Sequence, residues 1–156
     1  ISALRVDLSR TADIRYSHHY YDAGLVLVTP QDSSITMMDM MQGYRIAYEF
    51  GSVADSEVRD WERRIGRMQH RPYELPNYAL DAVRLGQADA ALVVNTSYRL
   101  YLRNHPNWQA QAHHVTSEIY AIALRIDRMD AWKLVNYAIS ALKDRGELAK
   151  IIEQWL

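Results

Sequence analysis

The turn at Gly51-Ser52 combines residue types that can bind an anion. It follows the segment Tyr44 to Phe50, which is predicted to be a strand, and it precedes a helix expected from about Ala54 to Ile65. A strand that passes through Gly-Ser into a helix leaves backbone N–H groups unpaired beside the positive end of the helix dipole. This arrangement favours a carboxylate or phosphate, and Ser52 is also suited to capping the helix.

A second candidate edge follows the apolar run that ends at Val94. Residues 76–85 place apolar side chains at helical spacing, and a glycine then ends that helix. The run Ala88 to Val94 is almost continuously apolar, as in a strand that is covered on both faces. Because ligands of open α/β sheets bind beyond the carboxyl ends of the strands, we expect Val94, Asn95 and Thr96 at a binding edge.

Two adjacent histidine pairs, His18-His19 and His113-His114, invite a metal interpretation. Neighbouring strand residues point to opposite faces, so neither pair chelates one ion naturally, and no third ligand is set by the spacing. The chain also lacks a Gly-x-Ser-x-Gly elbow, a glycine-rich phosphate loop and a His-Glu-x-x-His motif. We therefore predict no metal site, no cofactor, no catalytic residue and no enzymatic activity.

The composition is that of an ordinary globular protein, with 156 residues, 49% hydrophobic and 24% charged. A formal net charge of −1 gives no electrostatic reason to expect nucleic acid as a partner. The absence of cysteine excludes disulfides and thiolate metal sites. Because Ile1 opens directly into patterned sequence, without an initiator Met or a leader, we expect the chain to be a piece of a longer protein.

After Tyr44 the expected strands and helices alternate, which predicts an α/β fold. A polar linker from Gln31 to Ser34 precedes this region and is a plausible domain boundary. Further strands are expected at 24–29, 71–75, 109–115 and 118–126, and further helices at 97–104, 130–144 and 147–156.

Several short motifs follow one another in a fixed order along the chain. They are Asp7-Leu8-Ser9-Arg10, Tyr16 to Tyr20, the apolar strand Leu25 to Val28, the Gly51-Ser52 turn, Leu85 to Ala90, and the strand Tyr120 to Leu124. In this order and spacing the chain resembles the family 3 extracellular solute-binding proteins, which are the amino-acid receptors of bacterial ABC importers. The resemblance covers essentially the whole chain.

The resemblance implies a type II periplasmic-binding-protein-like α/β fold, with one complete lobe and part of the second lobe joined by two hinge strands. Residues 1–30 would hold the end of lobe 1 and the first hinge strand, residues 31–117 the complete lobe 2, and residues 118–156 the second hinge strand and the helices that return to lobe 1. The first part of lobe 1 would be absent. We therefore expect a missing N-terminal half, or another chain, to cover the apolar stripe of the C-terminal helices.

The resemblance also implies how a ligand carboxylate would be held. Arg10 matches the arginine that clamps the α-carboxylate of the ligand, for which the planar guanidinium fork is well suited. Gly51, Ser52 and Val53 match the turn whose amides and hydroxyl meet the same carboxylate from lobe 2. Replacing Arg10 by alanine is expected to weaken carboxylate binding by several kcal/mol, the scale of a broken buried ion pair.

Other positions depart from the family pattern. Val94 stands where the family has the aspartate that receives the α-amino group, with Asn95 beside it, and a buried ammonium without a partner is costly. Ala3 and Arg5 stand at positions where the family usually has small hydroxyl or backbone hydrogen-bond acceptors and a Ser or Thr. Glu49 either supplies the missing negative charge or is an ordinary solvated glutamate. The ligand is therefore an ammonium compound paired with Glu49, or a carboxylate without an α-amino group.

The function implied by the resemblance is that of the extracytoplasmic binding component of an ABC importer. Two lobes would trap a small carboxylate-bearing solute by hinge closure, and the closed form would dock on a membrane permease. The alternatives are a ligand-sensing module of a signalling protein or, less in keeping with the motifs, an enzyme on the same fold, such as a dehydratase. A kinase or transglycosylase fused in the full gene would distinguish these alternatives from a receptor.

Overall fold

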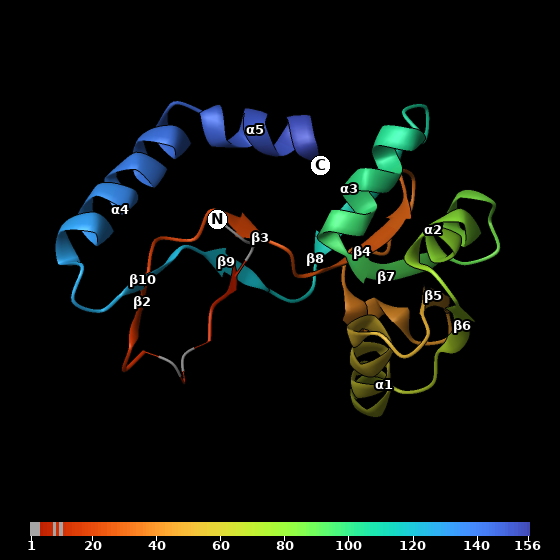
Figure 1. The fold of residues 1–156 in the computed structure, drawn as a ribbon. Coiled ribbons are helices and arrows are strands. Elements are labelled where there is room, and N and C mark those ends of the chain that lie inside the picture. Colours follow the sequence, from red (N-terminus) through yellow and green to blue (C-terminus); the bar gives the residue numbers. More distant parts are fainter. Residues whose placement is uncertain (1–3, 8, 10) are drawn as a thin grey trace. The chain divides into compact units, whose positions relative to one another are not determined.

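The computed structural model describes residues 4–7, 9 and 11–156 and divides into two compact units. One unit is continuous and contains Gly24–Ser117 (Figure 1). The other combines Ile1–Ala23 with Glu118–Leu156. Within the described residues, every helix is too short or too polar to cross a bilayer.

The 24–117 unit is built on a five-stranded mixed sheet with the strand order β6-β5-β7-β4-β8. Strand β5 runs parallel to both β6 and β7, whereas β4 is antiparallel to β7 and to β8. The strands are β4 (Leu25–Pro30), β5 (Arg45–Glu49), β6 (Gln69–Tyr73), β7 (Ala90–Val94) and β8 (Ala110–His114). The α/β fold that the alternation predicts is therefore present.

Helices cover both faces of this sheet, as the apolar run before Val94 predicts. On β4, Leu25 and Leu27 pack into one cluster and Val26 and Val28 into another, because alternate strand residues face opposite sides. The first cluster includes side chains of α1 (Val53–Ile65) and of the 3-10 helix η2 (Met38–Met41). The second includes side chains of α2 (Pro76–Arg84) and α3 (Asn95–Asn104).

Thr29, on β4, is fully buried, and among the described residues its Oγ1 atom finds no hydrogen-bond partner. A buried hydroxyl without a partner costs about 1–3 kcal/mol. Replacing Thr29 by valine, which has nearly the same shape, is expected to raise the free energy of unfolding by about 1 kcal/mol. Chemical denaturation of the two proteins measures this difference; a less stable valine variant would show that the hydroxyl is satisfied in solution.

The described residues of the second unit form two small sheets and two α-helices. Strand β9 (Ile119–Ala121) lies between β1 (Leu4–Arg5) and β3 (Tyr21–Asp22), and β10 (Ala123–Arg125) pairs with β2 (Ile14–Tyr16). The helices are α4 (Met129–Asp144) and α5 (Glu147–Trp155).

We expected a single strand at 118–126. This prediction is wrong in one respect, because the segment is divided into β9 and β10 at Ile122. The Ile122 amide donates to Ser17 Oγ at 2.9 Å, and the Ser17 amide donates to the Ile122 carbonyl at the same distance. The pairing partner therefore changes at this residue, from β1 and β3 to β2.

Polar contacts tie helix α4 to β2 and to the residues that follow it. Trp132 Nε1 donates to the Tyr16 carbonyl at 2.8 Å, and the His18 amide donates to Asn136 Oδ1 at 2.7 Å. Leu134 and Tyr137 of the same helix are 69% and 75% exposed. The expectation that a further segment or chain covers this helix stays a prediction.

The two compact units are defined by contacts within the chain, and the domain limits at 1–30, 31–117 and 118–156 stay predictions. Residues 24–30 group with the following unit rather than with residues 1–23, because β4 is hydrogen-bonded along both edges, to β7 and β8. The second boundary between the units lies between Ser117 and Glu118. The assignment of these units to lobes, and the hinge role of Leu25 to Val28 and Tyr120 to Leu124, stay predictions.

Candidate functional site

Two strand ends form the candidate edge of the 24–117 unit. Strands β5 and β7 are parallel, with Tyr48 opposite Leu92, so their carboxyl ends meet at the same edge of the sheet. The Gly51-Ser52 turn follows β5, and Asn95 begins α3 directly after Val94 ends β7. The structure thus brings together two groups of residues that lie more than 40 positions apart in the sequence.

The Gly51-Ser52 turn is shaped by a left-handed glycine and a capping serine. Gly51 has a φ of +73°, which an L side chain rarely adopts. Ser52 Oγ accepts from the amides of Ala54 and Asp55 at 3.1 and 3.3 Å and donates to the Glu49 carbonyl at 2.7 Å. Ser52 is therefore the N-cap of α1, as its position in the sequence predicts.

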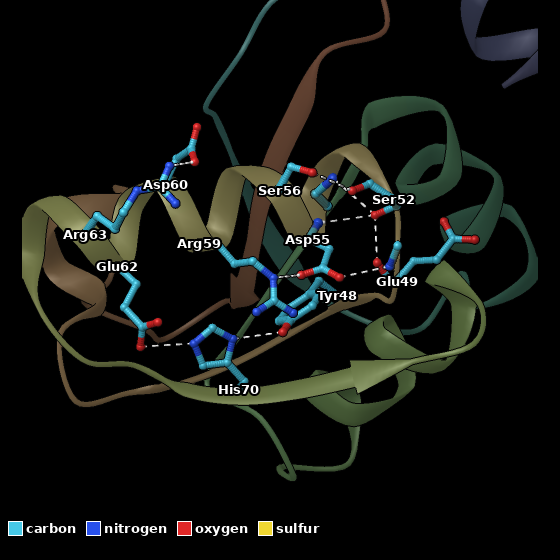
Figure 2. Close-up of polar contacts among 12 residues, drawn as sticks. Tyr48, Glu49, Ser52, Asp55, Ser56, Arg59, Asp60, Glu62, Arg63 and His70 are labelled. Carbon is cyan, nitrogen blue, oxygen red and sulfur yellow. Dashed lines mark hydrogen bonds and ion pairs between the residues drawn. The ribbon is translucent and has the colours of Figure 1, made fainter.

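The amide of Gly51 already has an anionic partner from the same chain. It donates to Asp55 Oδ2 at 2.9 Å, while Arg59 Nε donates to Asp55 Oδ1 at 2.7 Å (Figure 2). Burial acts to raise the pKa of Asp55, but these two hydrogen bonds, together with the nearby positive charge of Arg59, hold the pKa below its ordinary value. A ligand carboxylate would have to displace Asp55 to reach this amide, so the ligand role of Gly51 stays a prediction.

Three other predicted residues stand at this edge. Val53, the first residue of α1, is 65% exposed. Val94 is half-buried and packs against the cluster that contains Leu25, and the Asn95 amide donates to the Gly24 carbonyl at 3.0 Å. Neither Val94 nor Asn95 therefore contributes a side-chain charge to this edge.

Glu49 ends β5 and is half-buried. Its carbonyl is engaged by Ser52, but its side chain points away from Asp55 and Arg59 (Figure 2). Among the described residues, its carboxylate forms no ion pair. The position is compatible with contact to a ligand cation, which remains an untested prediction.

The remaining predicted residues are not part of this edge. Arg5 is exposed on β1, in the other unit. Ala3 and Arg10 lie outside the described residues. Their predicted roles are not tested by the geometry. Within the described residues, no three His, Cys, Asp or Glu side chains group closely enough to hold a metal ion.

A polar cluster beside this edge was not predicted. Tyr48 Oη lies 2.8 Å from His70 Nδ1, and His70 Nε2 lies 3.0 Å from Glu62 Oε1 (Figure 2). Burial, and then the charge of Asp55, raises the pKa of Tyr48. The Met68 amide and His70 both hydrogen-bond to Glu62 and lower its pKa. Tyr48 lies near His70 because β5 and β6 pair in parallel register. No sequence motif encodes this register, so the contact could not be predicted from a motif.

Known proteins resemble this chain in sequence over its whole length. ABC transporter arginine-binding protein 1 of Escherichia coli is 24% identical over 160 residues, which cover 99% of this chain and 64% of that protein. The ABC transporter glutamine-binding protein GlnH of Bacillus subtilis is 21% identical over 157 residues, which cover 100% and 56%. The chain thus spans about three fifths of these relatives' length. No protein-family model matches it.

Solved structures show the same fold. The second substrate binding domain of a putative amino acid ABC transporter from Streptococcus pneumoniae aligns with a TM-score of 0.76 at 18% identity, covering 100% of this chain and 71% of that one. The unliganded, open L-cystine solute receptor of Neisseria gonorrhoeae aligns with a TM-score of 0.78 at 24% identity, covering 96% and 62%. The five α-helices and the mixed sheet of the described residues therefore have a type II periplasmic-binding-protein arrangement.

Proposed function

We propose that this chain, which is a homologue of the family 3 extracellular solute-binding proteins, is the ligand-trapping part of an ABC importer's binding component. The observation that carries the proposal is the shared edge of β5 and β7, where Gly51-Ser52 and Val94-Asn95 meet in a homologue of amino-acid-binding proteins. The relatives are binding proteins, so the proposed activity is binding without catalysis.

The ligand is proposed to be a small carboxylate-bearing solute, an amino acid or a related compound. Arg10 would clamp the carboxylate through a bidentate ion pair. The start of α1 would approach the same group, because Ser52 caps the helix and Val53 is exposed beside it. The names of the relatives, which specify arginine, glutamine and cystine, support an amino acid as the first class to test.

The amino group of such a ligand would require a partner other than Val94. Glu49 ends β5, two residues before Gly51 of the Gly51-Ser52 turn, and is the acidic residue proposed for this contact. Its carboxylate forms no ion pair within the described chain and so remains available for a ligand ammonium. The second candidate, a carboxylate without an α-amino group, needs no contact with Glu49.

We further propose that the two units close on the ligand by a hinge and that the closed form docks on a membrane permease, outside the cytoplasm. The chain crosses between the units twice, at Ala23-Gly24 and at Ser117-Glu118, which suits a two-strand hinge. The exposed Leu134 and Tyr137 of α4 would be covered by a further segment of the protein or by another chain.

Replacing Glu49 by glutamine separates the two ligand classes. If the ligand ammonium pairs with Glu49, the affinity is expected to fall at least about tenfold, because the ammonium loses its charged partner. Isothermal titration of the full-length gene product with arginine, glutamine and cystine measures the change. Glu57→Gln, on α1 of the same unit, is the matched control and should bind like the wild type.

An unchanged affinity of Glu49→Gln would reject the ammonium contact. A protein that binds a simple carboxylate but no amino acid would favour the second ligand class. A protein that binds none of these compounds and no carboxylate would overturn the proposed function.

A further inference from the structure

A hollow of about 650 Å³ lies beside α1 and β6, and none of the predicted ligand residues lines it. Its wall includes three arginines from three different segments: Arg59 on α1, Arg67 on the turn that follows, and Arg71 on β6. Its volume lies within the range of about 300–1,000 Å³ that is usual for small-molecule sites. We call it the α1–β6 hollow.

The carboxylates in and beside this hollow are already engaged by the protein. Glu62 accepts a hydrogen bond from the Met68 amide at 3.1 Å and lies 3.0 Å from His70 Nε2. Asp55 is held by the Gly51 amide and by Arg59 Nε. Each of these carboxylates therefore already has two partners within the unit.

The guanidinium groups are far less engaged. Arg59 uses its Nε for Asp55, and Arg71 donates through Nη1 to the adjacent His70 carbonyl at 3.2 Å. Within the described residues, neither Arg67 nor Arg71 forms an ion pair with an acid. A guanidinium carries five N–H donors, so most of the donors at this wall remain open to a ligand.

The floor of the hollow has a fixed geometry. His70 is held between Tyr48 and Glu62, and the Arg59 side chain lies beside this line of contacts (Figure 2). Tyr48 is only 1% exposed, so its position is set by the core. Because these side chains are already held in place, their loss of conformational entropy on ligand binding would be small.

We propose that the α1–β6 hollow binds a small oxyanion with two or more negative charges, of the carboxylate or phosphate type. Three arginines and one internally hydrogen-bonded carboxylate, that of Glu62, line the hollow, which leaves a local excess of positive charge in a chain whose net charge is −1. Planar guanidiniums bind carboxylate and phosphate oxygens in pairs. The arginines lie on three different segments of the chain. A ligand with several oxyanion groups therefore contacts more of these arginines than a ligand with a single charged group does.

The test uses NMR titration of the ¹⁵N-labelled chain with pyrophosphate, with citrate and with acetate, at about 150 mM salt, where long-range attraction is screened. Saturable shifts are expected at the amides of Gln69, His70 and Arg71 with one or both of the multivalent probes. Binding of pyrophosphate alone would indicate a phosphate ligand, and binding of citrate alone would indicate a polycarboxylate. Binding of both probes would indicate a general oxyanion site. Acetate is expected to give no saturable shift at the same concentration.

Matched double variants show whether the arginines of the hollow are responsible. Arg67→Gln with Arg71→Gln is expected to weaken binding of the probe at least about tenfold, because two charge-assisted contacts are lost. Arg63→Gln with Arg64→Gln removes the same charge from the last turn of α1, outside the hollow, and should change the affinity less than about twofold, since screened charges contribute little. Circular dichroism checks that both variants are folded.

Equal weakening by the two double variants would overturn the proposal, since it would mean that net charge alone attracts the probe. Shifts that do not saturate, or acetate binding as tightly as citrate, would overturn it as well. The site lies within the 24–117 unit and does not depend on the proposed import function. Failure of the amino-acid titrations therefore leaves this result unaffected.

Discussion

Replacing Gly24 by alanine is expected to destabilise the 24–117 unit by at least about 3 kcal/mol, at the upper end of the cost of overpacking. A Cβ atom at this position would lie 1.7 Å from the carbonyl oxygen and 2.5 Å from the carbonyl carbon of Thr116. It would also lie 2.8 Å from the Ser117 Cα atom. All three are backbone atoms, which no side-chain rotation can move away, so the two chain segments would have to separate.

That separation would disturb the hydrogen bonds that join the start of β4 to the residues after β8. The Leu25 amide donates to Thr116 Oγ1 at 3.0 Å, and the Leu25 carbonyl accepts from the Val115 amide at 2.9 Å. Hydrogen exchange followed by mass spectrometry should therefore show faster exchange in β4 and β8 of the Gly24→Ala variant. Urea denaturation supplies the corresponding change in the free energy of unfolding.

Gly86→Ala is the control for this experiment. Gly86 has a φ of +70° but open space around its Cα, so alanine there should cost only about 1 kcal/mol, from the backbone conformation. If Gly24→Ala were no less stable than Gly86→Ala, the close approach of Gly24 to Thr116 would not exist in solution. The comparison thus separates steric exclusion from backbone strain.

Elements whose position is set by a local pattern were predictable from the sequence. The apolar run that ends at Val94 predicts a strand covered on both faces, and β7 is buried between two core clusters. Gly51-Ser52 predicts the start of a helix, and α1 begins at Val53 with Ser52 as its cap. In both cases the residues that determine the structure are close neighbours, so the periodicity and the capping side chain carry the information.

Features that depend on pairing between distant residues were not predictable in the same way. The break at Ile122 arises from its exchange of hydrogen bonds with Ser17, which no pattern within 118–126 reveals. The contact between Gly51 and Asp55 had a visible signal, an aspartate in the first turn of the helix, but its competition with a ligand carboxylate was not anticipated. Site predictions based on the resemblance therefore need the local contacts of this chain.

Replacing Asp89 by asparagine is expected to lower the free energy of unfolding by about 2 kcal/mol, the scale of charge-assisted hydrogen bonds. The Asp89 carboxylate accepts three bonds from Arg45, from the backbone amide and Nη2 at 2.7 Å and from Nε at 3.1 Å. Arg45 Nη1 also donates to the carbonyls of Gly86 and Gln87. This ion pair therefore joins the start of β5 to the turn before β7.

The pH dependence of this difference follows from the pKa of Asp89. The hydrogen bonds from the Arg45 side chain lower that pKa, against the opposing effect of burial. The stabilisation is therefore complete above the pKa of an unfolded aspartate, about 3.9, and is lost as the pH falls through the lower pKa of the folded protein. The gap between wild type and Asp89→Asn should be constant between about pH 6 and 8 and should close below about pH 4.

Urea denaturation across this pH range, with Asp32→Asn as the control, measures the gap. Asp32 is exposed in the loop after β4 of the same unit and, among the described residues, forms no ion pair, so its replacement should leave the free energy of unfolding within about 0.5 kcal/mol of the wild type. A gap for Asp89→Asn that persisted unchanged into acid would mean that the carboxylate acts through its shape and not its charge. The Arg45–Asp89 pair would then hold the starts of β5 and β7 by packing alone, because a contact that depends on charge must weaken once the carboxylate is protonated.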